Sequence, residues 1–182
     1  MAQRLPICTI GHSTLSIDAF AERLRAGQVQ RVIDIRAIPR SRTHPQFNQA
    51  TLPDALAPFG IGYSHIAALG GRRRRSRDVP PEVNGFWDNA SFHHYADYAL
   101  HPAYQEGLAE LREQGQRERV AIMCAEAVWW RCHRRIVADW LIAAGESVRH
   151  ILPTRIDEAR LNPGAHVGPQ GIVTYPAPAD AQ

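Results

Sequence analysis

Apolar runs of strand length alternate along this chain with amphipathic runs of helix length. That alternation is typical of βα units stacked around a parallel sheet, so it restricts the chain to the α/β class. We expect one compact domain over residues 1–152, with a mainly parallel sheet of about five strands flanked by helices. The expected strands run from Pro6 to Ile10, Val32 to Ile35, Ile61 to Ile66, Arg119 to Cys124 and Ser147 to Leu152.

Segments with helical spacing separate these strands. Ser16 is a candidate N-cap because its hydroxyl can accept a hydrogen bond from the first turn, and Gly27 is placed to end the same helix. Pro102 interrupts a longer helical run, where it either breaks or kinks the helix or begins a second one. The other helical stretches are Leu52 to Phe59, Phe92 to Gly115 around that proline, and Ile136 to Ala144.

The carboxyl-terminal residues 153–182 turn to Pro, Gly and Ala and include Tyr175-Pro-Ala-Pro. This composition predicts an extended tail without a core of its own. If such a segment is ordered, it must lie on its own domain or on another chain. The sequence therefore leaves open whether the chain forms an oligomer through this tail.

Charge and cysteine usage restrict the function classes. The net charge is +3, and all 21 Lys and Arg residues are Arg, which excludes Schiff-base chemistry by a side-chain lysine. Three cysteines without a secretory leader predict a reducing compartment, and we expect the cytoplasm. No run reaches the roughly 18 apolar residues of a membrane span, so we expect no membrane partner.

Reactive side chains are concentrated in one segment, Cys124-Ala-Glu126 and, five residues later, Cys132-His133-Arg134. It follows an expected strand and precedes an expected helix, which is where parallel α/β proteins place active groups. A cysteine in the first turn of a helix gains thiolate character, although Cys132 can equally face the core. The candidate catalytic residues are Cys132, Glu126, His12, Cys124 and His133.

The role of Glu126 has two readings, because a carboxylate near a strand end needs a partner. It either forms a structural ion pair, with Arg134, Arg36 or His12, or acts as a general acid and base.

A second set of residues predicts anion binding, since arginine pairs with phosphate or carboxylate through two parallel hydrogen bonds. For Asp34 and Arg36 an internal salt link is an equal alternative. This candidate anion-binding set is Arg36, Arg42, Ser13, Ser41, Arg134 and Asp34, with Arg40 and His44 in the same loop.

The run Arg72, Arg73, Arg74 and Arg75 precedes Pro80-Pro81 and is expected in a loop. Such a run is usually only solvated. Because aromatic residues from Phe86 to Tyr95 follow it, it can also follow a phosphate backbone while the rings stack on bases.

Three specific chemistries remain for the cysteine segment. A phosphatase-type loop needs five residues between Cys and Arg, and Cys124 and Arg131 have six. We expect no cofactor, although a divalent metal at Cys124, Glu126, Cys132 and His133 is open despite the awkward spacing. A Cys124 to Cys132 redox couple is also open.

Five separated motifs occur in one order: Thr9-Ile-Gly-His-Ser13, Asp34-Ile-Arg36 with Ser41-Arg42, Leu69-Gly-Gly71, Cys124-Ala-Glu126 and Cys132-His-Arg134. With these motifs the chain resembles the uncharacterised family called domain of unknown function 488, over roughly residues 7 to 152. The resemblance implies a compact α/β fold and carries no activity with it.

If the sheet is parallel, these motifs meet at the carboxyl edge of its strands. The favoured hypothesis is an enzyme acting on a nucleotide, nucleic-acid or phosphorylated substrate in an Arg, Cys, His and Glu pocket there. The alternatives are a non-catalytic nucleic-acid-binding module and a metal or redox thiol protein.

Overall fold

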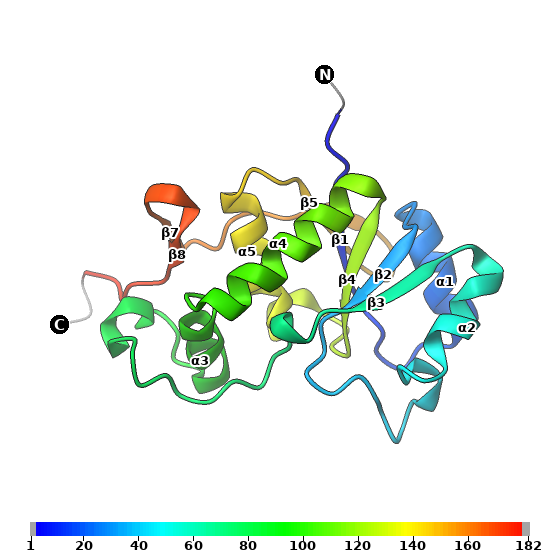
Figure 1. Cartoon of the computed structure of the whole chain (residues 1–182), viewed down its shortest axis with the longest axis horizontal. Coiled ribbons are helices and arrows are strands. Elements are labelled where there is room, and N and C mark those ends of the chain that lie inside the picture. Colours follow the sequence, from blue (N-terminus) through cyan, green and yellow to red (C-terminus); the bar gives the residue numbers. More distant parts are fainter. Residues whose placement is uncertain (1–2, 180–182) are drawn as a thin grey trace.

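A six-stranded sheet in the order β3-β2-β4-β1-β5-β6 forms the centre of the molecule (Figure 1). The computed structural model describes residues 3–179. β1 to β5 are parallel, and β6 is antiparallel to β5. The sheet strands are β1 (Ile7–Gly11), β2 (Arg31–Asp34), β3 (Gly62–His65), β4 (Val120–Cys124), β5 (Val148–Ile151) and β6 (Ile156–Glu158). A separate hairpin pairs β7 (His166–Val167) with β8 (Val173–Thr174).

Helices cover both faces of the sheet (Figure 1). They are α1 (Ile17–Ala26), α2 (Leu52–Leu56), α3 (Ala90–Tyr98), α4 (Pro102–Arg117) and α5 (Arg134–Ala143). On one face Phe20 and Leu24 of α1 pack with Leu56 of α2 against the sheet. On the other face Leu108 of α4 and Trp140 of α5 close a second apolar cluster. The predicted fold class, an α/β domain with a mainly parallel sheet, is confirmed.

The strand order reverses direction at the centre of the sheet. From β1 the chain crosses through α1 to β2 on one side, whereas from β4 it crosses through α5 to β5 on the other side. In open parallel sheets such a reversal leaves a crevice at the carboxyl ends of the strands involved. Here those ends are Gly11 and Cys124, which are direct neighbours in the register.

Capping residues, prolines and glycines in the sequence predicted most helix ends correctly. The Ser16 hydroxyl accepts a hydrogen bond from the Ala19 amide at 3.1 Å, as an N-cap should. Pro102 begins α4, so the long helical run is two helices. Gly60 adopts a left-handed conformation with φ of 71°, which ends the segment containing α2.

The carboxyl-terminal segment contributes more to the fold than its composition predicted. It adds β6 to the edge of the sheet, so the sheet has six strands instead of about five. It also places Val173 and Tyr175 in the apolar cluster around α5. The Tyr175 hydroxyl donates a hydrogen bond to Asp139 Oδ2 at 2.6 Å, and the Tyr175 amide donates to Asn84 Oδ1 at 2.9 Å. The segment therefore lies on its own domain.

No helix within residues 3–179 is both long enough and apolar enough to cross a membrane.

Replacing Tyr175 by Phe tests the anchor of this segment. Burial raises the pKa of Asp139 to about 6, so above that pH the variant leaves a buried carboxylate with one donor fewer. We expect Tyr175→Phe to lower the free energy of unfolding by about 1.5–3 kcal/mol above that pH and by less below it, measured by urea denaturation.

Tyr98→Phe is the matched control, because the Tyr98 hydroxyl donates to a neutral carbonyl, that of Ala68, at 2.7 Å. We expect it to cost about 0.5–1.5 kcal/mol at either pH. Equal and pH-independent losses in the two variants would contradict a charged partner for Tyr175.

Candidate functional site

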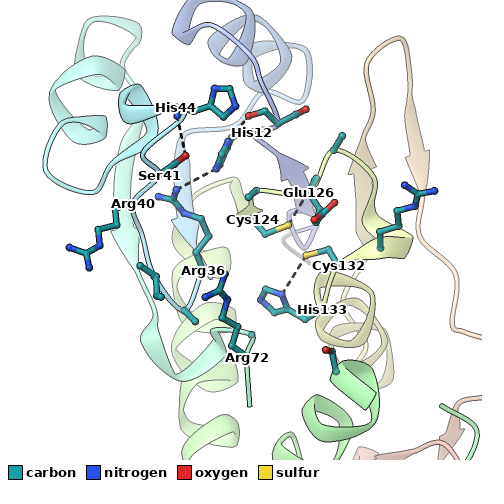
Figure 2. A pocket seen from close by; sticks show the side chains of 18 of the residues that line it. His12, Arg36, Arg40, Ser41, His44, Arg72, Cys124, Glu126, Cys132 and His133 are labelled. Atoms are coloured by element: carbon teal, nitrogen blue, oxygen red, sulfur yellow. Dashed lines mark hydrogen bonds between the residues drawn. The ribbon is translucent and has the colours of Figure 1, made fainter. Parts of the chain in front are cut away.

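A cavity of about 1150 Å³ opens at the carboxyl edge of the sheet, beyond β1, β2 and β4 (Figure 2). Its lining is strongly basic, because it contains five arginines, three histidines and a single acidic residue. These side chains are Arg36, Arg40, Arg42, Arg72, Arg131, His12, His44, His133 and Glu126. Cys124 and Cys132 line the same cavity. The crevice predicted from converging motifs is therefore present.

Gly11 makes the approach of the loop after β4 possible. A Cβ atom at Gly11 would lie 1.7 Å from the Glu126 carbonyl oxygen, so only glycine allows this loop to cross the end of β1. The same carbonyl accepts a hydrogen bond from Arg134 Nη2 at 2.7 Å. Arg134 Nη1 donates to Thr9 Oγ1 at 3.2 Å. One guanidinium thus ties together β1, the loop after β4 and the start of α5.

Arg134 is only 1% exposed and has no carboxylate partner among residues 3–179. A buried cation needs a nearby negative charge to offset its desolvation. The neighbouring groups that can supply this negative charge are the thiols of Cys132 and Cys124. The Arg134 amide also donates to Cys132 Sγ at 3.4 Å. The arrangement therefore favours a thiolate as the counter-ion of Arg134.

The two thiols respond to these surroundings in opposite directions. Burial acts to raise the pKa of Cys132, but the neighbouring Cys124 thiol and the charge of Arg134 outweigh it and lower the pKa to about 7. Burial and the neighbouring Cys132 raise the pKa of Cys124 well above its usual value. Cys132 is therefore the thiolate of the pair and Cys124 the thiol.

His133 lies against Cys132 in a fixed tautomer. Its Nε2 is 2.8 Å from the Ile35 carbonyl oxygen, which can only accept, so Nε2 carries the proton. Burial lowers the pKa of His133, which leaves the ring neutral and Nδ1 unprotonated. Nδ1 lies 3.5 Å from Cys132 Sγ. A Cβ at Gly71 would come within 3.0 Å of that nitrogen, so the glycine leaves room for the ring.

Hydrogen bonds hold Arg36 rigidly in the cavity wall opposite Cys132 and His133. Its Nε and Nη2 donate to the two carboxylate oxygens of Asp34 at 2.9 and 2.7 Å, and Nη2 also donates to the Phe47 carbonyl. Asp34 additionally accepts from the Tyr63 hydroxyl and does not line the cavity. Of the two alternatives for this pair, the structure has the internal salt link, because Asp34 is fully buried. Arg36 itself still faces the cavity.

His12 completes that wall as a neutral ring. Its Nδ1 donates to the Ser13 carbonyl at 2.9 Å, which leaves Nε2 to accept from Arg36 Nη1 at 3.4 Å. Burial lowers the pKa of His12 to about 4, and the ring stacks on Phe47 with centroids 4.3 Å apart. His12 therefore carries no positive charge at neutral pH, and its Nε2 lone pair faces Arg36.

Glu126 does not behave as a buried acid. Its side chain is exposed at the cavity and forms no ion pair among the described residues, so the expectation that it needs a partner was wrong. β4 ends at Cys124, so Glu126 lies in the loop beyond the strand. Ser13 faces the cavity beside it in a left-handed conformation, with φ of 46°. Such backbone strain concentrates at functional sites.

The loop after β2 presents further donors. The Ser41 hydroxyl accepts from the His44 amide at 3.0 Å, and the Ser41 amide donates to Asn48 Oδ1 at 2.6 Å. These bonds hold the loop in shape, while the side chains of Arg40 and Arg42 remain exposed at the cavity.

The four arginines of the predicted nucleic-acid run take different positions. Arg72 lines the main cavity. Arg73 lies over the Tyr98 ring at 3.8 Å and donates to the Gly70 carbonyl at 3.0 Å, so it stabilises the fold. Arg74 and Arg75 line a separate cavity of about 380 Å³.

In the described part of the chain, side chains that could bind a metal do not lie together. Residues 3–179 contain no group of three or more His, Cys, Asp or Glu side chains placed to hold one ion. The proposed set included Glu126, whose carboxylate is exposed to solvent. The cation of Arg134 lies beside both thiols instead.

Sequence reasoning did not assign a role to the support behind Arg134. Thr9 Oγ1, which accepts from Arg134, also lies 2.7 Å from His150 Nδ1. The His150 ring stacks on Trp129 with centroids 4.4 Å apart, so it supports the turn that leads to Cys132. The one available signal was a threonine within an otherwise apolar strand. From the sequence, Arg131 was considered only as the arginine of a phosphatase-type loop. In the structure it lines the cavity.

Comparison with known proteins identifies a family and no further relative. Neither the curated proteins nor the solved structures contain a match to this chain. The family model described as domain of unknown function DUF488 matches residues 16–141, which include most of the cavity lining. The chain therefore belongs to the DUF488 family, as its motifs suggested.

Proposed function

We propose that this protein is an enzyme that uses the Cys132 thiolate as a nucleophile on an anionic substrate. The observation that carries the proposal is the buried guanidinium of Arg134, which has no carboxylate partner in the described residues and lies beside two thiols. A structural arginine is ordinarily paired with a carboxylate, as Arg36 is with Asp34. Holding an arginine against a thiol instead favours a reactive sulfur at neutral pH.

The basic lining supports an anionic substrate. Arg36 presents one preorganised nitrogen, and the exposed guanidinium groups of Arg42 and Arg72 can pair with phosphate or carboxylate oxygens. Hydroxyl groups of Ser13 and Ser41 add donors at the same wall. A nucleotide or another phosphorylated compound suits both this charge and the size of the cavity.

Three side chains with different surroundings, His133, Glu126 and His12, are the candidates for proton transfer in this proposal. His133 Nδ1, which lies 3.5 Å from the sulfur, can accept a hydrogen bond from the Cys132 thiol before the thiol loses its proton to solvent. Glu126 is exposed at the mouth of the cavity as a candidate general acid or base, and the neutral His12 presents its Nε2 lone pair to Arg36 Nη1. Such chemistry needs reduced cysteines, and the three cysteines are free, which suits a reducing cytoplasm.

Alkylation by iodoacetamide tests the nucleophile. We expect the rate at Cys132 to rise through one titration centred at the pKa of about 7, with Cys124, His133, Arg134 and Tyr95 as the interacting groups. Peptide mapping across that titration measures each cysteine separately. Cys8 is an internal control, because burial raises its pKa and it stays unmodified in the folded chain.

Arg134→Gln should move the Cys132 midpoint upward by at least about one pH unit, because it removes the cation. Circular dichroism shows whether the variant is folded. If wild-type Cys132 titrates with a pKa at or above 9.0, the ordinary value for cysteine, or reacts only after unfolding, the proposal fails.

Protection by inorganic phosphate tests the anion site. We expect phosphate to slow the alkylation of Cys132 in a saturable manner, and Arg72→Gln to weaken that protection by about 3- to 10-fold. Arg160→Gln makes the same change of charge at an exposed residue outside the cavity lining and should leave protection unchanged. Equal effects of the two variants would indicate general electrostatics and no anion site.

The second candidate function is nucleic-acid binding without catalysis. One observation favours it: the loop that supplies Arg72 to the main cavity continues into the second cavity, which Arg74, Arg75 and Arg77 line. A chain of phosphates can follow such a basic path, and electrostatic contacts with phosphates release counter-ions.

Fluorescence anisotropy with a labelled single-stranded RNA of about 20 nucleotides tests this candidate. The double variant Arg74→Gln and Arg75→Gln should reduce the slope of log affinity against log salt by about 1.4, or 0.7 for each lost contact. The control is the double variant Arg117→Gln and Arg160→Gln, both at exposed positions. Binding that does not change with salt would exclude this candidate.

A further inference from the structure

Cys124 is a buried nucleophile that the proposed mechanism leaves unused. It ends β4, is 3% exposed and lines the cavity with Cys132. Its sulfur also lies 3.9 Å from the Glu126 carbonyl oxygen, in the loop that Arg134 holds. A cysteine that only filled the core would be replaceable by a small apolar residue. Its position at the reactive thiol suggests a chemical role.

The two sulfurs face each other across the floor of the cavity (Figure 2). The two thiols are close enough to shift each other's pKa, that of Cys132 downward and that of Cys124 upward. Ionisable groups that shift each other's pKa in this way lie within about 4–6 Å, so a local shift would bring the two sulfurs to the S–S bond length of about 2 Å. Cys8, the third cysteine, lies on the opposite side of the sheet among residues packed against α1, so it cannot compete.

We propose that Cys132 and Cys124 form a hydroperoxide-reducing pair in which Cys132 is oxidised first and Cys124 then closes an intramolecular disulfide. This inference rests on the proposed thiolate at Cys132. It adds an activity that needs no anionic substrate. Redox-active cysteines are accessible thiolates with a second cysteine in reach, and this cavity holds both.

The chemistry balances with a hydroperoxide as the only oxidant. The Cys132 thiolate attacks the oxygen that carries hydrogen, an S–O bond forms as the O–O bond breaks, and the other oxygen leaves as an alcohol or water after taking up a proton. The Cys124 sulfur next attacks the sulfenic acid sulfur. An S–S bond forms, the S–O bond breaks, and the hydroxyl leaves as water with the Cys124 proton. A dithiol reductant restores both thiols.

Arg134 suits the first step. It stabilises the thiolate before attack, and its bonds to Thr9 and to the Glu126 carbonyl keep it in place without a carboxylate that would neutralise it. In the resting pair only Cys132 has the lowered pKa, so the order of oxidation follows from the surroundings.

Peptide mapping after peroxide treatment tests the pair on the whole chain. Trypsin cleaves after Arg119, Arg131 and Arg134, so a disulfide would join the peptide of residues 120–131 to that of residues 132–134. We expect one equivalent of hydrogen peroxide to produce this linked species and dithiothreitol to remove it. Consumption of peroxide should be catalytic when dithiothreitol is present in excess.

Two variants separate this inference from its alternatives. In Cys124→Ser, Cys132 should stop at the sulfenic acid, which dimedone traps, and the linked peptides should be absent. Cys8→Ser should form the disulfide as the wild type does.

If wild-type Cys132 alkylates with a midpoint near 7 but peroxide gives only dimedone-reactive or overoxidised Cys132, the redox pair is wrong and the nucleophile stands. If Cys132 is inert to both reagents, both proposals fail. Disulfides that involve Cys8, or that link two chains, would also overturn the pair.

Discussion

The buried guanidinium of Arg134 is the interaction on which the site depends. It begins α5 and reaches back under the loop after β4, where it binds the Glu126 carbonyl and Thr9 of β1. β1 is more than 100 residues away from the other two elements in the sequence and meets them at the carboxyl edge of the sheet. Gly11 makes the meeting possible, because any side chain there would collide with the Glu126 carbonyl.

Two arginines, Arg36 and Arg134, lie at this edge of the sheet and have different roles. Arg36 is neutralised by Asp34, so it contributes shape and one directed donor to the cavity. Arg134 has no such partner in the described chain, and its charge acts on the thiols. The carboxylate decides the difference: a paired guanidinium stabilises the fold, whereas an unpaired one keeps its field for the neighbouring sulfur.

Histidine behaves here as a neutral, oriented group. His12 and His133 each donate one ring N–H to a backbone carbonyl, which fixes the tautomer and leaves the other nitrogen facing a functional partner. Burial lowers the pKa of both rings, so neither contributes a positive charge at neutral pH. The positive field of the cavity is therefore carried by arginine, which burial does not readily neutralise.

The sequence by itself determined the α/β fold, the strand ends at which the motifs lie, and the caps at Ser16 and Pro102, because periodicity and capping are local properties of the chain. It could not determine the protonation of Cys132, the exposure of Glu126 or the burial of Tyr175. The burial of Tyr175 depends on Asp139, 36 residues away, and the protonation of Cys132 depends on the crossing at Gly11 and on Thr9, which hold Arg134 beside the thiols. Burial and electric field arise only when those segments pack, so the tertiary structure alone decided which of the reactive residues share one environment.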